Sequence, residues 1–229
     1  MLSSVAAFAV APGDGIENSK HDFSDYGGGV SICMFCHTPH RAISTKLLWN
    51  HTLSQSNFSW DVPATTAGTS FPSFSGDSYT GPTSRCLSCH DGTVAVGDIG
   101  WYQGGKPATV YNLRLTGAYN IAPEGNLAGN HPTAMPIPFG NQPNTYNGVS
   151  TGPHAYLDEW QADPQQLGIR LFNDDGAGEI TAGAVPGKSG IECSSCHDPH
   201  NKKSVERRFL RGSMKGNDQS YLCLKCHRK

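Results

Sequence analysis

The sequence predicts a protein built mostly of irregular backbone, with short helices and a few short strands. Only 16% of its 229 residues are Asp, Glu, Lys or Arg, against about 25% in an ordinary soluble domain. Its 27 glycines and 15 prolines favour turns over long helices. Aliphatic runs with a helical or strand period are scarce, so we expect something other than side chains to fill much of the core.

Four copies of the motif Cys-x-x-Cys-His use all eight cysteines of the chain. They are Cys33/Cys36/His37, Cys86/Cys89/His90, Cys193/Cys196/His197 and Cys223/Cys226/His227. Two thiols about one helical turn apart can form thioethers with one haem, while the histidine that follows reaches the iron from one face. Cys-x-x-Cys alone also serves zinc sites and thiol redox enzymes, but those do not need a histidine after every pair. We therefore expect four covalently attached haems c, short helices at the motifs, and a chain of haems as the core.

The motifs also divide the chain into regions. Residues 33–90 and 193–227 carry the haems and are joined by a haem-free section, residues 91–192. We expect 33–229 to form a single domain, preceded by an N-terminal arm, residues 1–32. Both haem regions open with Cys-x-x-Cys-His-x-Pro-His, so they look like a degenerate repeat.

The other elements follow in chain order. Residues 1–9 are either the tail of a signal peptide, with small residues at an A-x-A site, or an apolar arm kept in the mature protein. Residues 54–84 predict a long loop whose aromatic rings are buried, with haem faces as hosts. Short strands are expected at Thr109–Leu115 and Ile169–Phe172. A helix capped by Asp218 is expected near the C-terminus, where it presents the last motif.

Six further histidines are available for the second axial position of the irons. They are His21, His40, His51, His131, His154 and His200. His40 and His200 each follow a proximal histidine by three residues, so they lie too close to it to reach round the same haem. Our hypothesis is that His40 serves the haem of His90. By the same repeat logic, His200 serves the haem of His227.

The haems of His37 and His197 need two more ligands. We favour His131, in an Asn-His-Pro turn, and His21, in Lys-His-Asp-Phe-Ser. The sequence does not rank these two securely against the remaining candidates. Methionine ligation is unnecessary, because the histidines suffice for two imidazoles on every iron.

The sequence resembles a known family around its motifs. The segments are CMFCHTPH, LLWNH, CLSCHDGTVAVGD, the His131-Pro132 turn, CSSCHDPHN and FLRGS…YLCLKCH. They resemble the doubled CXXCH multihaem cytochromes of metal-reducing bacteria. Four haems and the opening His-Asp-Phe-Ser…Gly-Gly-Val are similar to the extracellular filament (nanowire) cytochromes of the OmcE and OmcS type. This resemblance implies an irregular chain around a continuous row of bis-histidine haems, and a homopolymer in which an N-terminal histidine binds a haem of the neighbouring subunit. His21 matches that position.

These observations favour long-range electron transfer without a substrate, so we expect no enzymatic activity. His21 lies near one end of the chain and His227 near the other, and a head-to-tail contact that does not close propagates as an open filament. The expected redox partners are other cytochromes or extracellular metal oxides. One alternative is a monomeric periplasmic tetrahaem shuttle. Another is a multihaem reductase of small molecules, which needs one iron with an open site.

Composition limits the partners and the location further. The net charge is −2, and no acidic or basic block indicates nucleic acid. No stretch approaches the roughly 20 apolar residues of a transmembrane helix. We expect an exported protein, extracellular or at the cell surface, with the periplasm as the alternative.

Overall fold

The structure is a computed structural model that describes residues 10–26, 30–44, 46–102, 106–152 and 155–228. Most of these residues are in turns, bends and irregular backbone, which confirms the predicted fold class. Two α-helices are described, α1 (Thr83–His90) and α2 (Cys193–Cys196). α1 carries the second motif and α2 the cysteines of the third, so the expectation of short helices holds at these two motifs.

Short strands account for most of the remaining regular structure. The strands are β1 (Asn57–Phe58), β2 (Phe74–Ser75), β3 (Asp98–Tyr102), β4 (Lys106–Thr109), β5 (Met135–Pro136), β6 (Thr145–Tyr146), β7 (Val149–Ser150), β8 (Phe172–Asp174), β9 (Ile180–Ala182) and β10 (Ser189–Ile191). β5, β10, β8 and β9 form a four-stranded antiparallel sheet in that order. β1–β2, β3–β4 and β6–β7 are two-stranded antiparallel pairs. β10 leads directly into α2, so the sheet positions the third motif.

Eight short 3-10 helices complete the described elements. They are η1 (Ser24–Tyr26), η2 (Lys46–Leu48), η3 (Gly117–Tyr119), η4 (Pro123–Gly125), η5 (Phe139–Asn141), η6 (Leu157–Glu159), η7 (Pro164–Leu167) and η8 (Leu222–Lys225). The last of these contains Cys223 of the fourth motif, and Cys226 is its C-cap. Asp218 caps a turn before it by accepting from Ser220 N at 2.9 Å, so the predicted C-terminal helix is only this single 3-10 turn.

The sequence-based strand positions are only partly right. The strand predicted at 109–115 overlaps β4 at Thr109 alone, because the backbone bends at Val110, although residues 110–113 still form hydrogen bonds with residues 96–97. The strand predicted at 169–172 is displaced to β8, which begins at Phe172 and pairs with both β9 and β10. The predicted signal-peptide segment, residues 1–9, lies outside the described residues, and the division of the chain at residue 32 stays a prediction.

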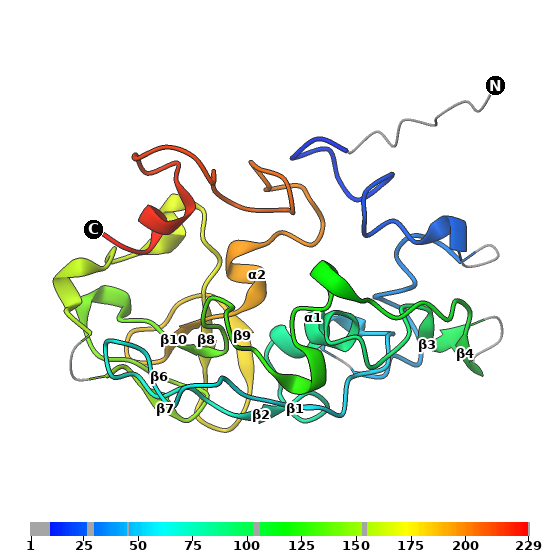
Figure 1. The fold of residues 1–229 in the computed structure, drawn as a ribbon, viewed down its shortest axis with the longest axis horizontal. Coiled ribbons are helices and arrows are strands. Elements are labelled where there is room, and N and C mark those ends of the chain that lie inside the picture. Colours follow the sequence, from blue (N-terminus) through cyan, green and yellow to red (C-terminus); the bar gives the residue numbers. More distant parts are fainter. Residues whose placement is uncertain (1–9, 27–29, 45, 103–105, 153–154, 229) are drawn as a thin grey trace.

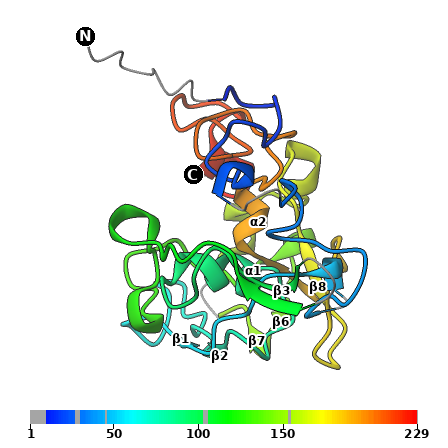
Figure 2. The same ribbon diagram turned by 90° about the vertical axis from the view of Figure 1, so that its right-hand side faces the viewer.

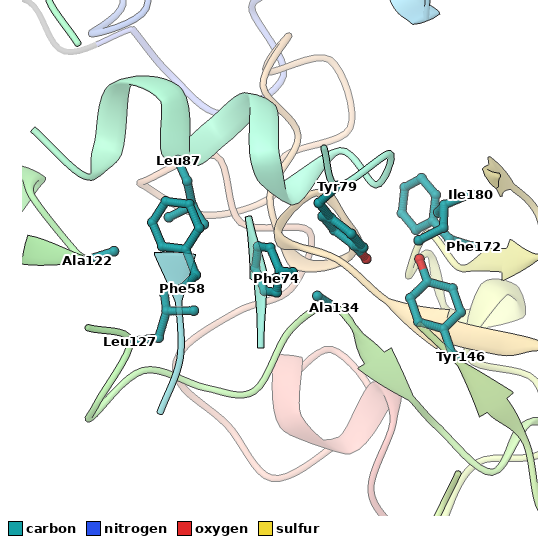
Figure 3. Packing of buried hydrophobic residues seen from close by; sticks show 10 residues of the cluster. All are labelled: Phe58, Phe74, Tyr79, Leu87, Ala122, Leu127, Ala134, Tyr146, Phe172 and Ile180. Carbon is teal, nitrogen blue, oxygen red and sulfur yellow. The ribbon is translucent and has the colours of Figure 1, made fainter. Parts of the chain in front are cut away.

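Side chains form more of the core than the sequence suggested. The largest cluster of buried residues contains Phe58, Phe74, Tyr79, Leu87, Ala122, Leu127, Ala134, Tyr146, Phe172 and Ile180 (Figure 3). Its aromatic members from the 54–84 loop pack on one another, with the Phe74 and Tyr79 ring centroids 4.6 Å apart. That loop therefore packs on protein side chains from α1 and the sheet, where haem faces had been expected.

The two ends of the chain lie on the same side of the molecule. In Figures 1 and 2 the blue N-terminal segment and the orange to red C-terminal segment lie above α1 and α2, while β1 and β2 lie on the opposite side. The contact is direct, because Asn201 Nδ2 donates to the carbonyl oxygens of Ala11 and Gly15, both at 2.9 Å. Among the described helices, none has the length and apolar character of a membrane-spanning segment.

Candidate functional site

The four Cys-x-x-Cys-His motifs lie in a row that follows the order of the chain. Asn50 N donates to Cys36 O at 2.9 Å and His51 Nε2 lies 3.4 Å from Cys89 Sγ, so residues 50 and 51 join the first motif to the second. Cys193 N, in the third motif, donates to Thr83 Oγ1 at the start of α1 at 3.1 Å. Arg211 N donates to Cys196 O and Leu222 N to Ser213 O, both at 2.8 Å, so residues 211–213 join the third motif to the fourth. In Figure 1, α1 and α2 lie between the red C-terminal segment and the blue N-terminal segment.

A buried carboxylate fixes the second motif against the third. Glu192 is 1% exposed and is the N-cap of α2. It accepts from Thr83 N at 2.9 Å, from the Tyr146 hydroxyl at 2.6 Å and from the Tyr79 hydroxyl. Burial raises the pKa of Glu192, while these hydrogen bonds oppose the rise. Because Thr83 begins α1, the carboxylate ties the two helices that carry the motifs.

Three proximal histidines have the same ring nitrogen bound to the backbone. His37 Nδ1 donates to Leu47 O at 2.6 Å, and His90 Nδ1 donates to Tyr119 O at 2.8 Å. His197 Nδ1 donates to Arg208 O at 2.7 Å. Since a carbonyl oxygen can only accept, the proton lies on Nδ1 and the lone pair lies on Nε2. Metal-binding histidines are oriented by such bonds from their other nitrogen.

Two of the predicted distal histidines show the same pattern. His21 Nδ1 lies 3.4 Å from Pro199 O, and His131 Nδ1 lies 2.9 Å from Pro132 O. Burial lowers the pKa of His21 to about 4, so its ring is neutral near pH 7. The neutral imidazole is the form that binds metals.

The structure brings six of the predicted axial histidines together as three pairs. The ring centroids are 6.1 Å apart for His37 and His200, 6.2 Å for His21 and His90, and 6.5 Å for His131 and His227. A metal–nitrogen bond of about 2 Å on each side, plus about 1 Å from nitrogen to ring centre, separates two imidazoles across one metal ion by about 6 Å. The spacing of each pair therefore fits two axial ligands of one haem iron.

These pairs differ from the pairing that the sequence suggested. His200 lies beside His37, whereas the sequence hypothesis assigned it to the haem of His227. The histidine beside His227 is His131. His21 lies beside His90, to whose haem the hypothesis assigned His40. The sequence hypothesis matched motifs that are neighbours in sequence and stays a prediction, whereas in the fold His200 of the third motif lies beside His37 of the first.

The remaining histidines have different surroundings. His51 is buried, and both ring nitrogens contact backbone oxygens, Nδ1 at 2.7 Å from Thr52 O and Nε2 at 2.9 Å from Ala95 O. His51 is therefore engaged as a structural residue. His40 is exposed and His197 is in none of the three pairs. His154 lies outside the described residues.

Burial affects several of the free cysteine thiols. All eight cysteines are free, and burial is the main cause that raises the pKa of Cys36 and Cys196 to about 11 and that of Cys226 to about 12. Zinc is bound by thiolates, in sets of about four ligands. In the part of the chain that the structure describes, no three His, Cys, Asp or Glu side chains come together as a possible metal site.

Sequence reasoning missed Glu192 as a residue of the site. The sequence does carry a local pattern that marks Glu192, because Glu192 and Ser195 form a capping box across the start of the third motif. The two tyrosines that bind it come from distant segments, so no local pattern marks them.

Comparison with protein families agrees with the motif chemistry. Residues 185–229 match the family described as a doubled CXXCH motif. The match covers the third and fourth motifs and supports a c-type cytochrome of the CXXCH group, with covalently bound haem c and a role in electron transfer. Proteins of this class are typically exported. No curated protein sequence matches the chain.

Proposed function

We propose that this chain transfers electrons over long distances through four haems c, one at each motif, as a subunit of an extracellular filament. Each haem supplies an iron that takes up and releases one electron. The protein holds the motifs at fixed spacing and supplies the axial imidazoles. Two histidine ligands favour a low reduction potential, because the thioether ligand that raises it is missing.

The observation that carries this proposal is the row of motifs together with the three imidazole pairs. Consecutive motifs are joined by hydrogen bonds, and each pair has the spacing of two ligands on one iron. A protein that passes electrons along a row of haems needs haems that lie close together, and it needs no open coordination site on the iron. At three of the four proximal histidines, a second imidazole lies where it would fill that site.

The fourth pair follows from the repeat. His200 of the third motif lies beside His37 of the first motif. By the symmetry of the two motifs, we propose that His40 of the first motif ligates the iron of His197. The proposed axial set is then His37/His200, His90/His21, His197/His40 and His227/His131.

The filament needs a contact between copies, and the N-terminal arm supplies it. Within one chain, the arm packs on Asn201 and brings His21 to His90. The same contacts made on a neighbouring copy exchange an identical element between subunits, which is a low-cost route to assembly. We propose that His21 ligates in this way in the filament, whose redox partners are other cytochromes or metal oxides.

A monomeric periplasmic shuttle is the second candidate, favoured by the contact of His21 and His90 within one chain. Imaging of the concentrated haem-loaded protein separates the two, because filaments support the proposal and discrete monomers support the shuttle. The mass of the intact protein counts the haems. A high-spin ferric haem in the native protein would indicate an open iron and would favour the reductase alternative.

A further inference from the structure

Three of the four motifs are bound by a short segment from elsewhere in the chain. We call these the clamp segments, residues 47–50 at the first motif, 208–211 at the third and 158–161 at the fourth. Each runs antiparallel to its motif. The paired residues are His37 with Trp49, His197 with Leu210, and His227 with Trp160.

The backbone contacts are the same at all three motifs. The last residue of each clamp segment donates its N–H to the carbonyl of the second cysteine. These bonds are Asn50 N to Cys36 O at 2.9 Å, Arg211 N to Cys196 O at 2.8 Å and Gln161 N to Cys226 O at 2.8 Å. Two residues before the end of each clamp segment, a backbone carbonyl accepts from the N–H of the residue that follows the proximal histidine. These bonds are Thr38 N to Leu48 O at 2.9 Å, Asp198 N to Phe209 O at 2.7 Å and Arg228 N to Glu159 O at 2.7 Å.

The side chain of the same last residue adds a third contact in every case. It donates to the carbonyl of the residue after the first cysteine. The bonds are Asn50 Nδ2 to Met34 O at 2.6 Å, Arg211 Nε to Ser194 O at 3.2 Å and Gln161 Nε2 to Leu224 O at 3.0 Å. Asn, Arg and Gln share only a side-chain N–H donor, so three different residue types meet one geometric requirement.

That requirement follows from the shortness of the helical turns. A helical turn leaves its last carbonyl groups without partners inside the helix. α2 and η8 have four residues each. The second motif lies on the eight-residue α1 instead, and the N–H groups of Asp91 and Gly92 satisfy its last carbonyls. The clamp segments therefore occur where the motif lacks a longer helix.

Two clamp segments also orient the proximal imidazole. Leu47 O and Arg208 O, each three residues before the end of its segment, accept from Nδ1 of His37 and His197. Both residues have a left-handed backbone, with φ of 56° and 60°, as do the residues that follow them. Such a conformation is strained in a residue other than glycine. At these two positions it aims a backbone carbonyl at the ring of the proximal histidine.

We infer that Asn50, Gln161 and Arg211 are positioning residues, which hold the first, fourth and third motifs in the turn that presents both thiols and the proximal histidine. This inference rests on the proposed function, since it assigns a role relative to the bound haem. A fixed imidazole with a hydrogen-bonded Nδ1 is a stronger electron donor to a metal. Each positioning residue therefore influences the haem of its own motif.

Gln161 gives the cleanest test. Among the described residues, the side chain of Gln161 donates to Leu224 O alone. The side chain of Asn50 also contacts Trp101, and that of Arg211 also pairs with Asp198 at 3.4 Å. Gln161→Met replaces the side-chain N–H donor with an apolar side chain of similar size. Gln161→Glu replaces it with a carboxyl side chain of the same shape. Gln161→Arg restores a donor of the kind used at the third motif. Gln142→Met, at an exposed glutamine, is the matched control.

The readouts are the number of attached haems, from the intact mass, and the potentials and electron paramagnetic resonance (EPR) g-values of the ferric haems. We expect Gln161→Met and Gln161→Glu to raise the potential or change the g-values of one haem, or to lose that haem alone. Gln161→Arg and Gln142→Met should match the wild type. Wild-type values in Gln161→Met, or an equal change in Gln161→Arg, would overturn the inference. A wild-type protein without haem would instead overturn the proposed function.

Discussion

The ring centroids of His37 and His200 lie 6.1 Å apart, although the two residues come from haem regions at opposite ends of the sequence. Residues of the first and third motifs therefore lie side by side in the fold. The three pairs with this spacing make specific predictions for the haem-loaded protein.

Replacing His200 with Ala removes one ring of the His37 pair. We expect one ferric haem to change from low-spin to high-spin while the others stay low-spin, as measured by EPR of the fully loaded protein. His51→Gln is the control, because both nitrogens of His51 contact backbone oxygens. A complete low-spin set in His200→Ala would show that the ring spacing does not reflect shared ligation.

Tyr146→Phe removes one donor to the buried Glu192 carboxylate. A hydrogen bond to a charged group contributes about 1.5–3 kcal/mol, so we expect the free energy of unfolding to fall by about that amount. Denaturant titration measures the change. Tyr119→Phe serves as the comparison, because the Tyr119 side chain is 57% exposed. Equal losses in both variants would contradict the role assigned to Glu192.

His51 should make stability depend on pH. Burial lowers its pKa from 6.5 in the folded state, so the unfolded chain binds the proton more readily. Stability is therefore complete above about pH 6.5 and falls as the pH drops below that value. Unfolding titrations between about pH 5 and pH 8 should show a steeper loss at acid pH for the wild type than for His51→Gln. Identical slopes would mean that the buried ring contributes nothing to this dependence.

Asn201→Asp tests how the N-terminal arm is held. The change keeps the Oδ1 acceptor for Gly13 N but removes the donor to Ala11 O and Gly15 O. We expect faster hydrogen exchange in residues 11–22 and, where His21 binds within one chain, a high-spin signal from the haem of His90. Protection of the arm equal to that of the wild type would show that other contacts hold it.

The sequence was sufficient for the motif chemistry and the fold class. The eight cysteines and the four histidines that follow them predict the attachment sites locally, and the glycine and proline content predicts the irregular backbone. Short helices at the motifs also follow from local spacing. These features depend on residues close together in the chain.

The pairing of the histidines was not predictable in the same way. It depends on packing between distant segments, such as the contact of Pro199 with His21. Of the aromatic residues of the 54–84 loop that were expected to be buried, Phe58, Phe74 and Tyr79 are buried and Trp60 and Phe71 are half-buried. Their partners, Leu87 and Tyr146 among them, come from elsewhere. The clamp residues carry a weak local signal in the dipeptides Trp49-Asn50 and Trp160-Gln161, whose meaning appears only when the segments meet their motifs.

A cryo-EM map of the native haem-loaded protein tests the central claim most directly. We predict four haems in the order of the motifs, with His37 and His200 on opposite faces of one iron, and likewise His90 with His21 and His227 with His131. A map with fewer than four haems, or with His37 and His200 on different irons, would contradict the account.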